Sequence, residues 1–181
     1  MKNHDRLIQV NSTYARGIRR EAATIQTLRG LGWQVTESSR EENTRQDIDA
    51  WRVLTLTDGR VAKLPISIKS LTARTFAKSG SLLFELDVLD SRTNTWNPSW
   101  FHNGKAKAYV VDVEGTGLYY ISKAKLLEYI EKHDFDRTVQ NTPDVVLSQF
   151  ESRHSHIDAY SGIIRLSKLV SAGAAKQILL Y

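Results

Sequence analysis

Charged residues stand inside several apolar stretches of this sequence, where burial would be costly without compensation. The stretch 66–70 reads as a short buried strand that carries Lys69 near its end, two positions after Ser67. Asp47 and Asp49 open another strand-like run, and residues two apart on a strand point to the same face. Carboxylates are ligands that Mg²⁺ prefers, and an ammonium beside them can orient water or stabilise developing negative charge. These residue types favour metal-assisted hydrolytic chemistry.

Glu21 is a further charged residue in an apolar setting. It repeats at spacings of three and four with apolar positions that share its predicted helix face, namely Ile18, Ile25 and Leu28. A carboxylate on such a face is costly unless something compensates it. Two interpretations stay open: Glu21 reaches solvent or an arginine at the edge of the stripe, or it faces a metal site.

The register of one predicted hairpin decides whether the acids meet the lysine. Its turn is predicted at Asp58–Gly59, and a strict two-residue loop there would put Asp49 and Lys69 on opposite faces. A three-residue loop with a glycine bulge would instead place Asp49 opposite Ser67. Asp47 would then lie opposite Lys69, unless it belongs to the preceding loop and only Asp49 enters the strand.

Another pair of acids lies on the next predicted strand, residues 81–90. Glu85 and Asp87 share one face of that strand, opposite an apolar face. If this strand lies beside the strand of Lys69, Glu85 can approach both Lys69 and Asp49.

The elements that must position these residues form an α/β (α+β) pattern. We expect one domain over 1–181, with a core over about 13–133 and a C-terminal extension over 134–181 that packs on it. The pattern predicts a central mixed sheet flanked by helices. Its expected elements are a loose lead-in over 1–11, helices over 13–29 and 122–133, and strands over 32–38, 81–90 and 159–170, with hairpins over 47–70 and 106–122. Residues 39–46 and 91–105 are expected as loops.

The composition sets limits on the classes of function. The 181 residues contain no cysteine, which excludes disulfides and thiolate metal sites, and the formal charge of +5 permits a nucleic-acid partner. The sequence has no apolar run near the length of a membrane span and no signal-peptide pattern. We therefore expect a cytoplasmic protein without a membrane partner.

The order of these pieces resembles the PD-(D/E)XK nuclease superfamily, of phage or mobile-element type, over roughly residues 13–122. The resemblance implies a restriction-endonuclease-like core. Glu21 matches the superfamily's helix glutamate, Asp49 its strand aspartate and Lys69 its lysine, with Asp47 as the alternate aspartate. Ser67 departs from the pattern, because an acid usually stands there.

The superfamily tolerates a displaced acid, and Glu85 is the candidate for that place here. The resemblance implies an endodeoxyribonuclease that uses Mg²⁺ or Mn²⁺. Such an enzyme could be structure-specific or could resolve DNA junctions. Its catalytic residues would be Glu21, Asp49, Ser67, Lys69 and Glu85. Its metal ligands would be Asp47, Asp49 and Glu85.

Two rivals stay open: a catalytically inactive nuclease-fold module that binds DNA or assembles, and a subunit that needs a partner. Paired cuts would call for a homodimer.

Basic and aromatic residues elsewhere are candidates for DNA contact. Expected phosphate-binding residues are Arg16, Arg19, Arg20, Arg74 and Lys78. Trp96 and Trp100 could stack on an unpaired base, or they could pack on the core as loop aromatics often do.

Overall fold

The protein folds into two β-sheets with helices around them. The computed structural model describes residues 3–72, 80–90, 93–132, 145–151 and 157–181. Side chains are described from residue 15 to 132 within these ranges, and again from residue 162. The α+β architecture and the mixed sheet flanked by helices confirm the predicted fold class.

The larger sheet has six strands in the order β1-β2-β3-β6-β7-β10. Its strands are β1 (Gln34–Glu37), β2 (Ala50–Thr55), β3 (Val61–Leu71), β6 (Ala108–Val113), β7 (Gly117–Ser122) and β10 (Ala175–Leu180). Strands β3 and β6 pair in parallel, and the other neighbours pair antiparallel. The sheet is therefore mixed, and its one parallel pair includes β3, the strand that carries Lys69.

The smaller sheet has four antiparallel strands in the order β5-β4-β9-β8. They are β4 (Ser81–Asp90), β5 (Thr95–Pro98), β8 (Val145–Glu151) and β9 (Ile157–Arg165). The described helices are α1 (Asn3–Gly30), α2 (Arg40–Gln46), α4 (Trp100–Asn103), α5 (Lys123–Lys132) and α6 (Leu166–Ser171). The C-terminal segment thus supplies strands to both sheets.

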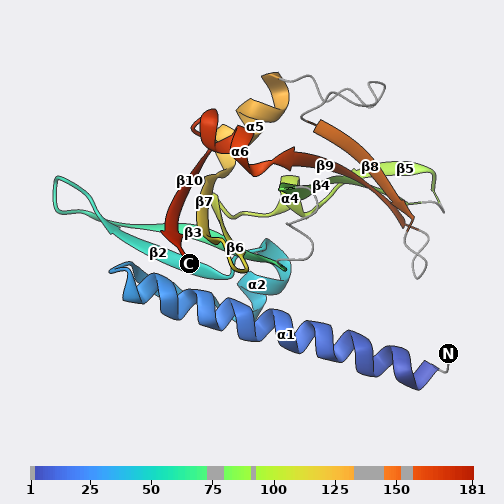
Figure 1. The fold of residues 1–181 in the computed structure, drawn as a ribbon, viewed down its shortest axis with the longest axis horizontal. Coiled ribbons are helices and arrows are strands. Elements are labelled where there is room, and N and C mark those ends of the chain that lie inside the picture. The colour runs from blue at the N-terminus through green and yellow to red at the C-terminus, as the bar shows by residue number, and fades with distance from the viewer. Residues whose placement is uncertain (1–2, 73–79, 91–92, 133–144, 152–156) are drawn as a thin grey trace.

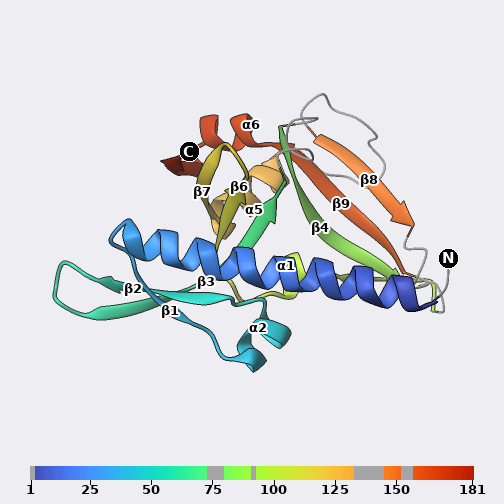
Figure 2. The ribbon, with the colours of Figure 1, turned by 60° about the horizontal axis from the view of Figure 1, so that its bottom comes forward.

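Two hydrophobic cores cover the two faces of the six-stranded sheet. On one face, Ile25 and Leu28 of α1 pack against Ile66 and Ile68 of β3. On the other face, side chains of β6 and β7 pack with those of β4, α5 and α6. Figures 1 and 2 show α1 across the first face and the smaller sheet on the opposite side. Ser67 and Lys69 alternate with the buried isoleucines, so they point away from α1.

Helix α1 is longer than the sequence patterns predicted. It begins at Asn3, so the expected loose lead-in over residues 1–11 is wrong for the described part. No glycine or proline occurs between Asn3 and Arg16, so nothing in the sequence interrupts the helix there. Among the described helices, none combines the length and the apolar character that crossing a membrane requires.

The expected loop over 39–46 contains the short helix α2. Ser39 accepts a hydrogen bond from the Glu42 backbone, and the Glu42 carboxylate accepts one from the Ser39 backbone. This capping box was legible in the sequence as serine followed three residues later by glutamate. The expected loop over 91–105 likewise contains β5 and α4.

The hairpin of β2 and β3 has the three-residue loop that brings the acids to the lysine. Leu56 donates its backbone N–H to the Arg60 carbonyl at 2.8 Å, and Gly59 adopts a left-handed φ of 81°. Ala50 then pairs with Ile66, which fixes the register along the whole hairpin. Strand β2 begins at Ala50, so Asp47 lies in the preceding loop.

Candidate active site

Asp49 lies just before β2 and extends the backbone pairing of β2 with β3 by one residue. Its backbone N–H donates to the Ile66 carbonyl at 2.9 Å. One carboxylate oxygen, Oδ2, accepts the backbone N–H of Ile68 and the Ser67 hydroxyl, the latter at 3.0 Å. The other oxygen accepts the Asn43 amide at 2.5 Å. Three groups from two elements therefore hold the carboxylate in one orientation.

Burial and hydrogen bonding shift the pKa of the Asp49 carboxyl in opposite directions. The residue is 8% exposed. Burial raises the pKa of its carboxyl, while the Ile68 hydrogen bond and the Lys69 charge oppose that shift. Asp47 is a nearby like charge and raises the pKa further. The site therefore concentrates negative charge in a poorly solvated place.

Asp47 ends α2 and pairs with the lysine. It adopts a left-handed conformation with φ 52° and ψ 42°, which turns its carboxylate toward β3. Lys69 Nζ lies 2.7 Å from Asp47 Oδ1, and the Ser67 hydroxyl lies 3.2 Å from the same oxygen. The Lys69 ammonium also lies 4.4 Å from the centre of the Trp100 ring. Ser67 is thus buried between two carboxylates, and its single proton can serve one of them at a time.

Two polar atoms beside this pair are buried without a hydrogen-bond partner in the described residues. They are Asp47 Oδ2 and the Tyr109 hydroxyl. Burial raises the pKa of Tyr109, and the Asp47 charge adds to that shift. Lys123 is also close, since Asp47 raises its pKa against the larger lowering by burial. The Asp47 carboxylate therefore interacts with Lys69, Tyr109 and Lys123.

Glu21 lines a surface cleft of about 380 Å³ together with Asp49. The residues around it come from α1, the end of β1 and α2: Gly17, Ile18, Glu21, Glu37, Ser38, Ser39, Arg40, Asn43, Thr44 and Asp49. Burial raises the pKa of Glu21 to about 7, with the Asp49 and Glu37 charges adding to the shift and Lys69 opposing it. Glu21 is therefore the carboxyl of this cleft on which the charges of the other two act.

The cleft explains why a glutamate stands on the apolar stripe of α1. Ile25 is 2% exposed and Leu28 is fully buried, but Ile18 is 49% exposed. The stripe is therefore buried at its C-terminal end and reaches solvent at Ile18, with half-buried Glu21 between the two. Among the described residues no arginine pairs with Glu21, so the cleft-facing interpretation fits the structure better than an edge ion pair.

The donor set of the cleft suits a magnesium ion. Mg²⁺ is bound through one or two carboxylates with waters and substrate phosphates, and this cleft is lined by the carboxylates of Glu21 and Asp49, of which Asp49 raises the pKa of Glu21. Within the described ranges, no group of three or more His, Cys, Asp or Glu side chains is arranged to hold a metal ion. Glu21 and Asp49 are thus two residues of this cleft that could bind such an ion.

Glu85 does not join this group. Strand β4 lies in the smaller sheet, and the free side of β3 is taken by β6. Leu82, Phe84 and Leu86 face the core between the sheets, so Glu85 lies on the outer face of β4. The condition under which Glu85 could approach Lys69, β4 beside β3, is not met, because the chain leaves the larger sheet after β3 and returns only with β6.

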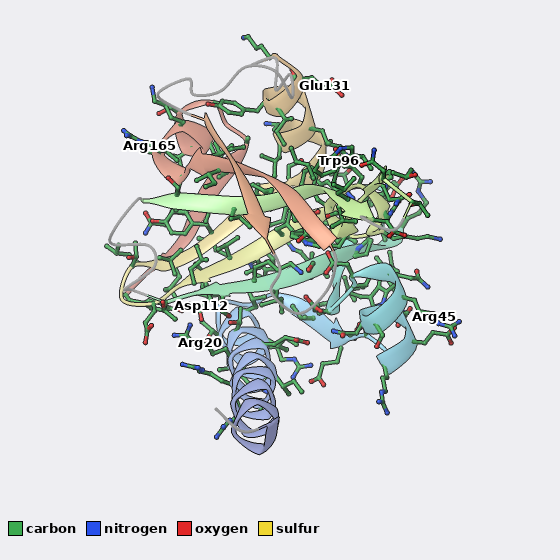
Figure 3. The ribbon with its side chains drawn as sticks, turned by 90° about the vertical axis from the view of Figure 1, so that its right-hand side faces the viewer. Arg20, Arg45, Trp96, Asp112, Glu131 and Arg165 are labelled. Carbon is green, nitrogen blue, oxygen red and sulfur yellow. The ribbon has the colours of Figure 1, made fainter. Side chains whose placement is uncertain are left out.

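The arginines expected to contact DNA occupy different settings. Arg16 and Arg19 are exposed on α1, whereas Arg20 pairs with Glu114 at 3.0 Å. Figure 3 shows Arg20 beside Asp112, where α1 meets the end of the larger sheet. Arg74 and Lys78 lie outside the described residues.

The two tryptophans also differ. Trp100 packs edge-on against Phe101 and Tyr109 and carries Lys69 on its face, so it is part of the site's wall. Trp96 is half-buried on β5, and Figure 3 shows it well away from Arg20. The expected aromatic and basic contacts do not form one continuous surface.

Several residues of the site escaped sequence analysis. Asn43 orients Asp49, and Tyr109 and Lys123 surround Asp47. Asn43 lies in α2, whose capping box could have indicated a helix that holds it in place. Nothing local marks Tyr109 or Lys123, because their proximity to Asp47 arises from strand pairing.

Comparisons of the chain with family models, with curated proteins and with solved structures found no match.

Proposed function

We propose that this protein is a Mg²⁺- or Mn²⁺-dependent deoxyribonuclease. The observation that carries the proposal is that Glu21 and Asp49 line one cleft while Asp49 is bonded to Ser67, next to the Asp47–Lys69 pair. The order of these residues along the chain, in a mixed sheet flanked by helices, supports the resemblance to PD-(D/E)XK nucleases.

In this proposal Glu21 and Asp49 would hold the ion. A bound Mg²⁺ lowers the pKa of its water and offsets charge on the phosphoryl oxygens. Asn43, Ser67 and the Ile68 N–H hold Asp49 in one orientation, so it does not have to reorganise. Lys69 supplies positive charge beside the attacked phosphate and an N–H donor for the water.

The test is cleavage of supercoiled plasmid, single-stranded DNA and branched DNA with Mg²⁺ or Mn²⁺. We expect Asp49→Asn and Lys69→Met to lose about 100-fold or more in rate, since each removes a charge that acts on the transition state. Glu85→Gln is the matched control and should cleave like the wild type. Equal cleavage by all variants would refute the proposed site, and thermal unfolding checks that each variant is folded.

A second candidate function is a DNA-binding or assembly module that does not cut. The observation that favours it is Ser67 at the usual acid position, with Glu85 on the outer face of the other sheet. Calorimetric titration with Mn²⁺ separates the two candidates. Binding that Asp49→Asn abolishes supports the nuclease, whereas DNA binding without ion binding supports the inert module.

A further inference from the structure

A second cavity borders the same 46–49 segment as the acidic cleft, with Gln46 and Ile48 in its lining where the cleft has Asp49. Its volume is about 750 Å³, within the range of roughly 300–1,000 Å³ that small-molecule sites occupy. The lining residues are Gln46, Ile48, Trp51, Leu64, Pro65, His102, Asn103, Gly104, Lys105, Ala106, Lys107, Lys123, Ala124 and Leu127. This lining contains three lysines and a histidine but neither aspartate nor glutamate.

Backbone hydrogen bonds hold the walls of this cavity together. Lys105 donates its N–H to the Gln46 carbonyl at 2.7 Å, and Lys107 donates to Pro65 at 2.8 Å. Lys123 donates its N–H to the Lys107 carbonyl at 3.0 Å. Four separate segments of the chain are therefore tied to one another, so the cavity is formed before any ligand arrives.

The cationic part of the cavity has no carboxylate among its lining residues. Lys123 is only 9% exposed, and its ammonium donates to a neutral acceptor, the Gly104 carbonyl, at 2.6 Å. Burial lowers the pKa of Lys123, the Asp47 charge opposes that shift, and repulsion from Lys107 adds a smaller lowering. Asp47 itself does not line the cavity, and its Oδ1 is bonded to Lys69. An anion in the cavity would lower the cost of placing these ammonium groups together.

The remaining wall is apolar and includes an aromatic residue. Trp51, Pro65 and Leu127 lie on it, and all three are half-buried. Hydrogen bonds from Ser39 and, to a smaller extent, from Trp51 lower the pKa of Glu42, so the indole is tied to α2. A planar group can stack on such a wall while a charged group meets the lysines.

We propose that this cavity binds a nucleotide, with its phosphate at Lys107 and Lys123 and its base against Trp51. A phosphate group carries up to two negative charges and several acceptor oxygens. It therefore suits a cluster of lysines better than a carboxylate ligand would. The nucleotide is either free or the phosphorylated end of a strand. This inference does not depend on nuclease activity, because the cavity shares no lining residue with the acidic cleft.

The experiment is calorimetric titration of the full chain with dAMP, deoxyadenosine and inorganic phosphate. EDTA and 0.15 M salt, about the physiological ionic strength, exclude divalent ions and weaken non-specific charge effects. We expect dAMP to bind at least about tenfold more tightly than deoxyadenosine or phosphate alone. Lys107→Met should weaken dAMP binding by about tenfold or more, and Lys123→Met should weaken it similarly.

Lys132→Met is the matched control, because Lys132 lies on α5 but lines a different hollow. It should leave dAMP binding unchanged. Equal binding of dAMP and deoxyadenosine, or an equal loss in Lys132→Met and Lys107→Met, would overturn the proposal. Lys107 is exposed, so its variant keeps the test valid even if Lys123→Met fails to fold.

Short oligonucleotides with and without a 5′ phosphate distinguish the two sources of the nucleotide. Preference for the phosphorylated oligonucleotide over dAMP assigns the cavity to strand ends, whereas the reverse preference assigns it to free nucleotides. Failure to bind any of these phosphorylated ligands would refute the site.

Discussion

Single carboxylates in this protein differ because of the groups around them. Asp49 has hydrogen-bond donors on both oxygens, Asp47 has a lysine and a serine on one oxygen, and Glu21 has no such donors among the described residues. Glu21 is therefore the acid whose ionisation is least compensated. Its pKa of about 7 follows from that setting.

This setting predicts a pH dependence of stability. Since the folded pKa of Glu21 is raised from 4.5 to about 7, the folded state holds this proton more tightly than the unfolded state. Its contribution to stability is present below pH 4.5 and is lost as pH rises toward 7. Because the side chain is only half-buried, we expect a loss of about 1 kcal/mol after solvent screening.

Urea unfolding of the wild type and of Glu21→Gln at pH 4.5 and 7.5 measures this loss. The variant should lack the part of the pH slope that Glu21 causes. Addition of Mg²⁺ at pH 7.5 should stabilise the wild type more than the variant. Identical slopes for the two proteins would show that Glu21 is not perturbed.

The Tyr109 hydroxyl gives a second prediction at this scale. It is buried near Asp47 and has no partner among the described residues. Removal of an unpaired buried polar group costs little, so Tyr109→Phe should change the free energy of unfolding by less than about 1 kcal/mol, or increase it. Chemical denaturation measures the change. A loss of about 2 kcal/mol or more would show that the hydroxyl has a partner, such as a bound water.

At the scale of elements, α2 positions more of the site than its seven residues would indicate. Asn43 within it holds Asp49, and Asp47 at its end holds Lys69. The helix buries none of its own residues, so its stability depends on its capping box.

The capping box predicts a specific sensitivity. Ser39→Ala removes the side-chain acceptor for the Glu42 N–H and should cost about 1 kcal/mol in thermal or urea unfolding. Thr44→Ala is the control, because that hydroxyl bonds the Arg40 carbonyl within the helix and is not a cap. An equal loss in the two variants would contradict the role of the cap.

At the scale of the whole molecule, residues 175–181 contain one outermost strand of the larger sheet and connect that sheet to α1 through hydrogen bonds. Strand β10 pairs with β7 and covers its edge. The Tyr181 hydroxyl lies 3.0 Å from Asp112 Oδ1, and Thr24 of α1 lies 3.4 Å from the other oxygen of that carboxylate. Tyr181 and Thr24 of α1 thus both bond the Asp112 carboxylate of β6, which links the two elements indirectly.

Removal of residues 175–181 should therefore abolish cooperative unfolding or make the protein aggregate. The truncation exposes the edge of β7 and removes Ala175 from the core. Removal of Tyr181 alone should cost only about 1 kcal/mol, since this exposed residue contributes two hydrogen bonds, to Asp112 and to the Thr116 carbonyl. Calorimetry and light scattering compare the two proteins. Cooperative unfolding of the longer truncation would contradict this role for β10.

Local sequence signals determined much of this fold. The turn at Asp58–Gly59 predicted the β2–β3 hairpin but left two registers open, and the structure decided for the one in which Asp47 meets Lys69 and Asp49 meets Ser67. The strand over 81–90, the 106–122 hairpin and the α5 helix were also predictable, because turn chemistry and periodicity act between near neighbours.

Only the tertiary structure decided which strands lie side by side. Pairing of β3 with β6, and of β4 with β9, joins segments far apart in the chain and depends on the packing of the whole core. That choice removed Glu85 from the site and brought Tyr109 and Lys123 to Asp47. The sequence alone determined which charged residues are costly to bury, and long-range packing determined which of them share a site.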